Sequence, residues 1–344
     1  MRLTGLQPAD LLDRSRVVSV PMRLTFRGIS AREAMILEGP EGPAEWGPFV
    51  EYDDEEAAIW LLSAIEQGFS PLLPKAPADI DRIRVNGTIP AIEPAELGPL
   101  VKKFKGVRTL KVKVAEPGQS TIDDVGRLAK LRQLVGPDVV IRLDANGAWS
   151  VSEAERALFM LQAFDIDYVE QPVQTLDQTV RLKERLRGSP IRIAVDELVR
   201  KSGDVDVVLR SGAADLVVLK VNPLGGLSRS LEIARQAFEN RVEVVVSSAL
   251  ETSVGLSLGA TLQALLQSER GGMPDAGLGT GTFLTGDIVT EPLLPVDGWI
   301  PVRPAVVDPR KLKRYEAAPD RIQWWQERLT RCFQVLTDKG LLET

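Results

Sequence analysis

Acidic and basic residues stand at regular intervals along the chain, each at the end of an apolar run. Asp144, Glu170 and Asp196 are separated by 26 residues each (144 to 170 and 170 to 196), and Lys220 follows Asp196 by 24. This interval matches one strand and helix of a parallel barrel, so these side chains should meet at neighbouring strand ends. Three clustered carboxylates repel one another unless a cation lies among them. All-oxygen ligation predicts Mg²⁺, with Mn²⁺ as a substitute, rather than Zn²⁺.

Three lysines indicate what such a metal site would do. Lys111 and Lys113 are two residues apart on a predicted strand, so both should face the barrel interior. Lys220 lies about half-way round the ring and should approach the same centre from the other side. Burial and a neighbouring cation both lower the pKa of a lysine, which is ~10.4 in water, and Lys111 and the metal would supply that cation. Because metal ligation of a carboxylate stabilises the negative charge left when its α-proton departs, the set predicts proton abstraction next to a carboxylate.

Each of these charges also has a plainer explanation. A single charge at a strand end is usually a solvated terminus or an ion pair, and only the whole set in register favours a metal site. Glu197 could replace Asp196 as a ligand, because the two residues adjoin. Neighbours on a strand face opposite ways, so only one of them should point at the metal.

Four residues near the predicted strand ends are candidate substrate contacts. Arg142 and Asn146 lie two residues either side of Asp144 and should share its face. Arg142 could instead form an ion pair within the barrel. Ser247 and Ser248 end a later apolar run and could donate hydrogen bonds to a substrate carboxylate, or serve as structural hydroxyls.

The composition argues against several other classes of protein. The 344 residues contain no histidine, which removes His-based triads, HExxH zinc sites and His–Asp dyads. The single cysteine, Cys332, cannot form an internal disulfide and suits a reducing cytoplasm. A net charge of −6 argues against nucleic-acid binding, and we expect neither a signal peptide nor a membrane span. We therefore expect a cytoplasmic protein that acts on a small-molecule carboxylate; the sequence leaves the oligomeric state open.

The elements that would position these residues fall into two regions. Residues 1–85 mix strand-like runs with an amphipathic helix at 57–67, which predicts an α+β capping domain. Residues 86–299 alternate strands and helices and predict an α/β fold, a modified (β/α)₈ TIM-type barrel. A doubly wound sheet is the alternative, but no GxGxxG motif follows a first strand. The expected strands are 83–91, 108–114, 139–144, 166–170, 191–196, 215–220, 242–248 and, less clearly, 276–279.

Two further segments carry structural expectations. After about residue 300 the alternation stops, prolines become frequent, and a helix is predicted at 320–336. We expect this tail, 300–344, to pack on the capping domain. The short tract 26–29 could form a lid over the barrel mouth or an ordinary surface turn.

Six motifs together resemble a known family. As a set they resemble the muconate-lactonizing subgroup of the enolase superfamily, and within it the o-succinylbenzoate synthases of menaquinone biosynthesis. The resemblance covers roughly residues 83–290, and the N-terminal part fits the family's capping domain more loosely. The motifs are Lys111-Val112-Lys113, 142–149 (RLDANGAW), 169–172 (VEQP), 194–197 (AVDE), 219–223 (LKVNP) and 247–256 (SSALETSVGL).

The resemblance implies a role for each charged residue. Lys113 matches the general base, with Lys111 beside it, and Lys220 matches the lysine on the opposite face of the substrate. In these synthases 2-succinyl-6-hydroxy-2,4-cyclohexadiene-1-carboxylate (SHCHC) loses water by syn-elimination to give o-succinylbenzoate. Lys220 would then act through its charge and not as a second base. The metal ligands of the family match Asp144, Glu170 and Asp196.

Two other functions remain open at this point. Relatives racemise N-succinylamino acids or epimerise dipeptides with the same lysine pair, and there both lysines act as bases. The segment 277–282 contains no Asp-x-Asp motif, which disfavours the dipeptide epimerases. The third hypothesis is a non-catalytic, metal-dependent binding protein built on the same fold.

Overall fold

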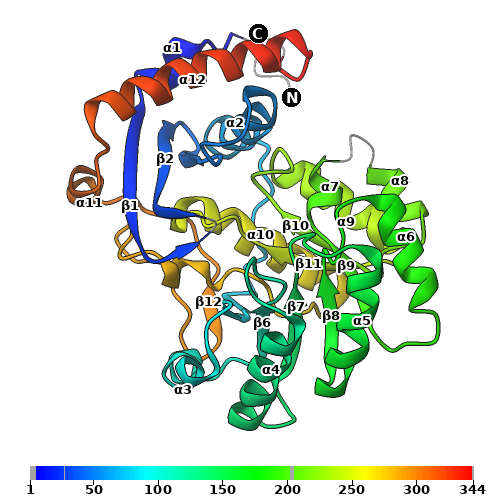
Figure 1. Ribbon diagram of the computed structural model, residues 1–344. Coiled ribbons are helices and arrows are strands. Elements are labelled where there is room, and N and C mark those ends of the chain that lie inside the picture. Colours follow the sequence, from blue (N-terminus) through cyan, green and yellow to red (C-terminus); the bar gives the residue numbers. More distant parts are fainter. Residues whose placement is uncertain (1–4, 27, 202–204, 343–344) are drawn as a thin grey trace.

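A curved parallel sheet forms the centre of the molecule (Figure 1). The computed structural model describes residues 5–26, 28–201 and 205–342. Within them seven strands pair in sequence order, and each runs parallel to its neighbours. They are β5 (Gly87–Ile89), β6 (Thr109–Lys113), β7 (Val140–Asp144), β8 (Ile166–Glu170), β9 (Arg192–Val195), β10 (Leu216–Lys220) and β11 (Glu243–Ser247).

The segment around Ala276 and Gly277 joins the two edges of this sheet. Ala276 bridges to Val85 beside β5, and Gly277 bridges to Ser247 at the end of β11. The expected strand at 276–279 is thus reduced to two isolated bridges. A Cβ at Gly277 would lie 2.4 Å from the Ser247 Oγ, so a larger residue there would require Ser247 to move. The TIM-type barrel is confirmed in this modified form.

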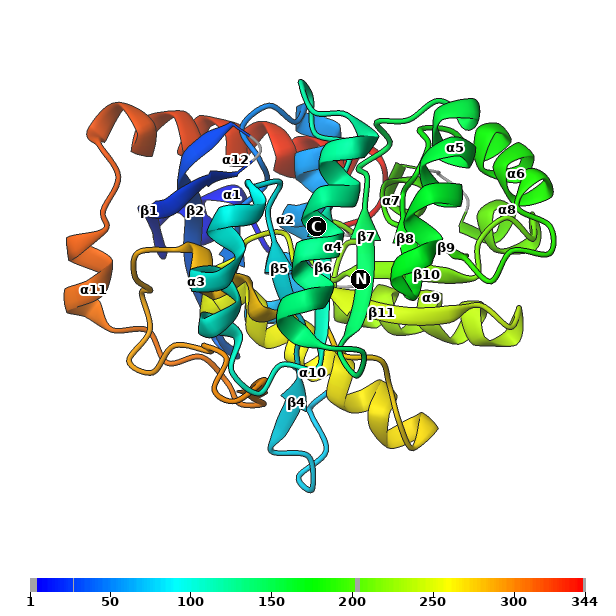
Figure 2. The same cartoon turned by 60° about the horizontal axis from the view of Figure 1, so that its bottom comes forward.

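The expected first strand, 83–91, is wrong as a single element. Its first part is β4 (Arg82–Arg84), which pairs antiparallel with β12 (Trp299–Pro301) from the C-terminal region. Only β5 joins the barrel sheet. β4 lies at the lower edge of Figure 2. The Asn86-Gly87 pair, a common turn signal, lies at the break, but the sequence could not reveal that the two halves have different partners.

Helices follow the barrel strands and bury one face against the sheet. Hydroxyl side chains cap the starts of two of them: the Ser150 Oγ accepts from the Glu153 amide at 3.3 Å, and the Thr175 Oγ1 accepts from the Gln178 amide at 3.3 Å. Buried leucines such as Leu128 and Leu158 join the barrel core. These helices are α4 (Thr121–Val135), α5 (Val151–Leu161), α6 (Leu176–Arg185), α7 (Glu197–Lys201), α8 (Val205–Arg210), α9 (Leu227–Glu239) and α10 (Ser253–Arg270).

The N-terminal region forms a separate α+β layer. A three-stranded antiparallel sheet, β1 (Ser15–Phe26), β2 (Ile29–Gly39) and β3 (Gly42–Trp46), packs on α2 (Asp54–Phe69). The Asp53 carboxylate starts α2 by accepting from the Glu56 amide at 2.8 Å. The tract 26–29 includes Arg27, which lies outside the described residues.

The C-terminal helix α12 (Pro319–Asp338) lies along this layer, as Figure 1 shows in red above α2 and β2. Its Trp325 ring meets the Trp46 ring edge-on, with centroids 5.1 Å apart. Cys332 and Phe333 are buried in the same apolar cluster, which also reaches Leu250 and Phe283 of the barrel. The cluster therefore connects tail, cap and barrel mouth. In the described part of the chain, no helix is long and apolar enough to cross a membrane.

Candidate active site

A cavity lies at the carboxyl ends of the barrel strands, beneath the cap. One wall is made of charged side chains from the strand ends, and the other of aromatic rings from the cap and the barrel loops. The lining includes Lys111, Lys113, Asp144, Asn146, Asp196, Glu197, Lys220, Ser247, Ser248, Phe49, Tyr52, Trp60, Arg200 and Phe283.

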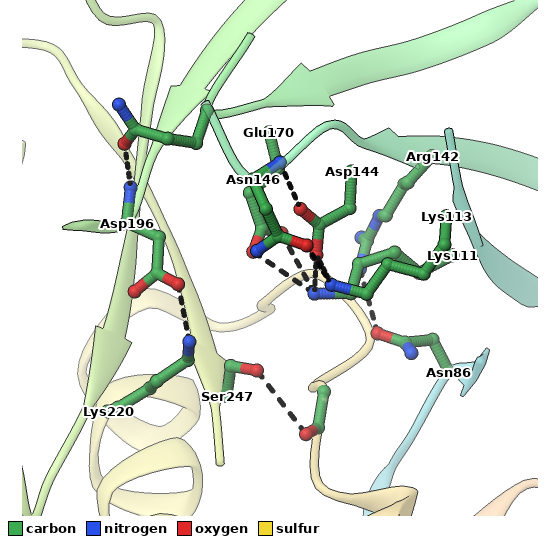
Figure 3. A network of polar contacts seen from close by, with 12 residues as sticks. Asn86, Lys111, Lys113, Arg142, Asp144, Asn146, Glu170, Asp196, Lys220 and Ser247 are labelled. Carbon is green, nitrogen blue, oxygen red and sulfur yellow. Dashed lines mark hydrogen bonds and ion pairs between the residues drawn. The ribbon is translucent and has the colours of Figure 1, made fainter. Parts of the chain in front are cut away.

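Lys111 connects two of the expected metal ligands. Its Nζ lies 2.9 Å from the Asp144 Oδ2 and 3.0 Å from the Glu170 Oε1. Both carboxylates are almost completely buried, and they are register partners on β7 and β8. The regular spacing in the sequence thus becomes direct side-by-side placement (Figure 3).

Lys113, two residues further along β6, contacts the same Asp144 carboxylate. Its Nζ donates to the Asp144 Oδ2 at 2.7 Å and to the Asn146 Oδ1 at 2.5 Å. Asn146 has the left-handed φ of +47°, which an asparagine tolerates better than most residues. Its Nδ2 also donates to the Glu197 Oε1 at 3.3 Å. Asn146 therefore lines the cavity and orients the Lys113 ammonium group.

Lys220 enters from the opposite side of the cavity and pairs with Asp196 (Figure 3). Lys113 ends β6 and Lys220 ends β10, and the strands β7, β8 and β9 lie between them. The two lysines are therefore about half a ring apart. β9 ends at Val195, before the acidic pair. Because Glu197 already begins α7, Asp196 and Glu197 do not alternate as strand neighbours would. Both line the cavity, so strand alternation does not decide which of the two would point at a metal.

The charges of the site shift one another's pKa values. Burial raises the pKa of Glu170, and the negative charges of Asp144 and Asp196 raise it further against the opposing effect of Lys111. Burial also raises the pKa of Asp144, but Lys111 and Lys113 outweigh it and hold that pKa below its usual range. For Lys220 burial lowers the pKa, yet Asp196 and Glu197 outweigh burial and raise it. In this arrangement Lys220 is a protonated cation at neutral pH.

The donor set fits a hard divalent cation. Among the described residues no three acidic groups converge with metal-ligating geometry, since lysine ammonium groups stand between the carboxylates. However, the Glu197 Oε2 is buried without a hydrogen-bond partner, and burial followed by the charge of Asp196 raises the pKa of Glu197. A further positive charge would relieve both costs. Carboxylate oxygens without nitrogen or sulfur ligands suit a hard cation.

Arg142 lies away from the cavity. Its guanidinium donates to the Asp167 Oδ2 at 3.1 Å and to the Asp275 carbonyl at 2.7 Å, and it stacks on the Tyr168 ring. These partners belong to the other end of the barrel, near the strand starts. The structure favours the ion pair over the substrate contact for Arg142, because its long side chain reaches the amino-terminal ends of the strands while Asp144 lines the cavity at their carboxyl ends.

Ser247 and Ser248 both line the cavity, where the barrel ring closes. The Ser248 Oγ donates to the Gly277 carbonyl at 2.9 Å and lies 2.7 Å from the Thr280 Oγ1. The Ser247 Oγ lies 3.4 Å from the same carbonyl. The two hydroxyls therefore already serve the structure, and both remain within reach of a ligand in the cavity.

Two further residues beside the cavity were not singled out from the sequence. Gln171 follows Glu170, and its Oε1 accepts from the Asp196 amide at 3.1 Å, so it fixes the backbone of one expected ligand relative to the other. Its place in the Glu-Gln-Pro motif was the available signal. Arg200 forms an ion pair with Glu56 of α2 and stacks on Tyr52, joining barrel and cap beside the cavity. No sequence pattern pairs α7 with a helix so far away along the chain.

Two family models match the chain. "Enolase C-terminal domain-like" matches residues 100–306, and "Enolase N-terminal domain-like" matches residues 17–68. The chain is 44% identical over 328 residues to the o-succinylbenzoate synthase of Mycobacterium marinum, covering 95% of each protein. It is also 44% identical over 329 residues to that of Mycolicibacterium smegmatis, covering 95% of this chain and 97% of the relative.

Solved structures share the architecture at lower identity. The muconate lactonizing enzyme from Pseudomonas putida is 19% identical with a TM-score of 0.72, covering 88% of this chain and 98% of that one. The L-Ala-D/L-Glu epimerase from Bacillus subtilis is 22% identical with a TM-score of 0.70, covering 85% and 96%. The N-succinyl Arg/Lys racemase from Bacillus cereus is 19% identical with a TM-score of 0.71, covering 88% and 97%. These likenesses show the fold, with cap and barrel together.

Proposed function

This chain belongs to the enolase superfamily, and from that premise we propose that it is an o-succinylbenzoate synthase, a metal-dependent lyase that removes water from SHCHC. One observation carries the proposed chemistry: Lys113 and Lys220 line one cavity from strands half a ring apart, with carboxylates between them. Identity of 44% over nearly the full length of two synthases supports the choice of substrate.

Asp144, Glu170 and Asp196 would hold the metal, for which we propose Mg²⁺, with Mn²⁺ able to replace it. To do so they would exchange part of their present ammonium contacts for the cation. When bound, the metal supplies positive charge that stabilises the substrate carboxylate as its α-carbon loses a proton. Glu197 lies close enough to take part in holding the cation, since it lines the same cavity as Asp196.

The chain's own residues then handle the proton. Lys113, oriented by Asp144 and Asn146, takes the α-proton and delivers it to the hydroxyl that leaves from the same face. The electrons of the broken C–H bond form a ring double bond, the C–O bond breaks, and water departs. Lys220 stays protonated and contributes its charge from the opposite side. Phe49, Tyr52 and Trp60 limit the access of water to this space.

The same lysine pair also permits a second function. With one lysine on each side of the cavity, an N-succinylamino acid could lose a proton to one and regain it from the other. That racemase activity would introduce deuterium at the α-carbon of recovered N-succinylamino acid in D₂O. An absence of exchange would exclude it.

The proposed function is tested by incubating the protein with SHCHC and Mg²⁺ and following o-succinylbenzoate formation. We expect turnover, its loss after exhaustive treatment with EDTA, and its recovery on addition of Mg²⁺ or Mn²⁺. Full activity after complete metal removal would contradict the metal requirement. A protein that binds Mg²⁺ but turns over neither SHCHC nor N-succinylamino acids would favour a non-catalytic binding function instead.

A further inference from the structure

A turn immediately after Lys220 is held from the cap and not only from the barrel. The turn comprises residues 221–226, and backbone hydrogen bonds close it: the Leu224 amide donates to the Lys220 carbonyl at 3.3 Å, and the Gly226 amide to the Val221 carbonyl at 3.1 Å. Gly226 ends the turn and precedes α9. The turn is thus continuous with the last residue of β10, Lys220, whose carbonyl accepts one of its hydrogen bonds.

The α2 helix of the cap reaches this turn through Glu66. The Glu66 Oε2 accepts from the Leu227 amide at 2.5 Å, and its Oε1 accepts from the Ser228 amide at 3.2 Å. These are the first amides of α9, and the preceding residue, Gly226, has no side chain with which to cap them. A carboxylate at a helix N-terminus is favoured by the helix dipole as well as by these bonds.

The backbone conformation of Gly226 and the nearby Glu66 carboxylate both disfavour a side chain at position 226. Gly226 has a φ of +123°, and a Cβ there would lie 2.2 Å from the Glu66 Oε2. The Glu66 side chain is largely buried, so its carboxylate contacts these backbone amides and little solvent. Residue 226 and residue 66 are therefore matched across the boundary between cap and barrel.

Ser63, one helical turn earlier on the same face of α2, makes a second contact with the turn. Its Oγ donates to the Asn222 Oδ1 at 2.9 Å, in a buried position. The Asn222 Nδ2 donates to the Glu251 Oε1 at 3.1 Å, and the Glu251 Oε2 accepts from the Ala249 amide at 2.7 Å. The chain of bonds thus runs from the cap, past the residue two places after Lys220, to the cavity-lining segment after Ser248.

We infer that Ser63 and Glu66 are positioning residues for Lys220: the cap fixes the turn after this lysine and thereby its place in the cavity. The expected effect on the active site rests on the proposed function. The contact between cap and turn rests on the hydrogen bonds alone. It assigns the cap a part in arranging the barrel's catalytic groups, besides covering the mouth. Neither residue touches the substrate cavity, since both act through the backbone and Asn222.

The contact itself is tested without substrate by hydrogen exchange across residues 221–228. Glu66→Gln should accelerate exchange there by about tenfold, because the helix start loses its counter-charge. The matched control is Glu55→Gln, the same substitution on the same helix, where the exposed side chain pairs with Lys339. Wild-type exchange rates in Glu66→Gln, with the fold intact by circular dichroism, would overturn the contact.

The link to Lys220 is tested by a double-mutant cycle on the affinity for o-succinylbenzoate in the presence of Mg²⁺. Glu66→Gln and Ser63→Ala should each weaken binding about three- to tenfold in the wild-type background, and by less than about twofold in Lys220→Ala. Equal losses in both backgrounds would make the contacts merely structural and overturn the inference. If Glu66→Gln fails to fold, Ser63→Ala alone decides. If the wild-type protein neither bound nor formed o-succinylbenzoate, the proposed function would be refuted. The contact between cap and turn would still be tested by the hydrogen-exchange experiment.

Discussion

Lys113 and Asp144 are direct register partners on β6 and β7, and their side chains meet with the Nζ 2.7 Å from the Oδ2. In the proposed reaction the first is the base and the second a metal ligand. The position of the base is therefore set by the ligand shell, so a change at Asp144 would displace Lys113 as well as weaken metal binding. This coupling shapes how variants of the site should behave.

The metal ligands are tested by calorimetric titration of Mg²⁺ into Asp196→Asn and Glu197→Gln. We expect Asp196→Asn to weaken binding at least ~100-fold and Glu197→Gln by a smaller factor, because Asp196 matches the ligand position of the family. Glu155→Gln, which changes an exposed partner of Arg185, is the matched control and should bind as the wild type. A larger loss in Glu197→Gln than in Asp196→Asn would exchange the two roles.

Gln171 should prove important although it is not a ligand. Its Oε1 holds the Asp196 amide, so Gln171→Ala removes the group that fixes this proposed ligand relative to Glu170. We expect Mg²⁺ affinity to fall about 10- to 100-fold, as is typical when a residue behind a metal ligand is lost. Gln171→Glu, which keeps the acceptor, should be milder. Unchanged affinity in Gln171→Ala would show that the backbone alone orients Asp196.

The stability of the protein should decline as the pH rises from about 4.5 to about 7, because of Glu45. Burial raises the pKa of Glu45 from 4.5 to about 7, so in this window the native state binds a proton that the unfolded state releases. The free energy of unfolding therefore falls as pH rises through the window, by up to about 3 kcal/mol. Urea titrations at several pH values should show a flatter profile for Glu45→Gln. An equally steep profile in that variant would assign the pH dependence to other groups.

Arg142 should matter for stability and not for turnover. Arg142→Met removes the ion pair with Asp167. Because Asp167 still pairs with Arg192 in the variant, we expect the free energy of unfolding to fall by only about 2 kcal/mol. The folded variant should retain kcat and KM for SHCHC within about threefold, because Arg142 lies at the far end of the barrel. A large rise in KM without loss of stability would restore it as a substrate contact.

The sequence predicts those parts of the structure that repeat. The interval between Asp144, Glu170 and Asp196 depends only on one strand and one helix, so it identifies neighbouring strand ends without any tertiary information. In 83–91 the Asn86-Gly87 pair could have signalled a break, but the partner of β4 could not be foreseen, since β4 pairs with a strand some 200 residues later. The direction of Arg142 and the ties from Ser63 and Glu66 to the barrel depend on side-chain packing between distant segments, which leaves no periodic signal.

The central claim is that one lysine, Lys113, carries both proton transfers while Lys220 contributes only charge. It is tested most directly by steady-state turnover of SHCHC by Lys113→Arg and Lys220→Arg beside the wild type. Arginine stays protonated and cannot act as a base. We expect Lys113→Arg to lose at least ~10³-fold in kcat, within the usual contribution of a general base, and Lys220→Arg to keep markedly more activity. Equal, near-complete loss in both variants would contradict the single-base account, and no turnover of SHCHC by the wild type would contradict the substrate.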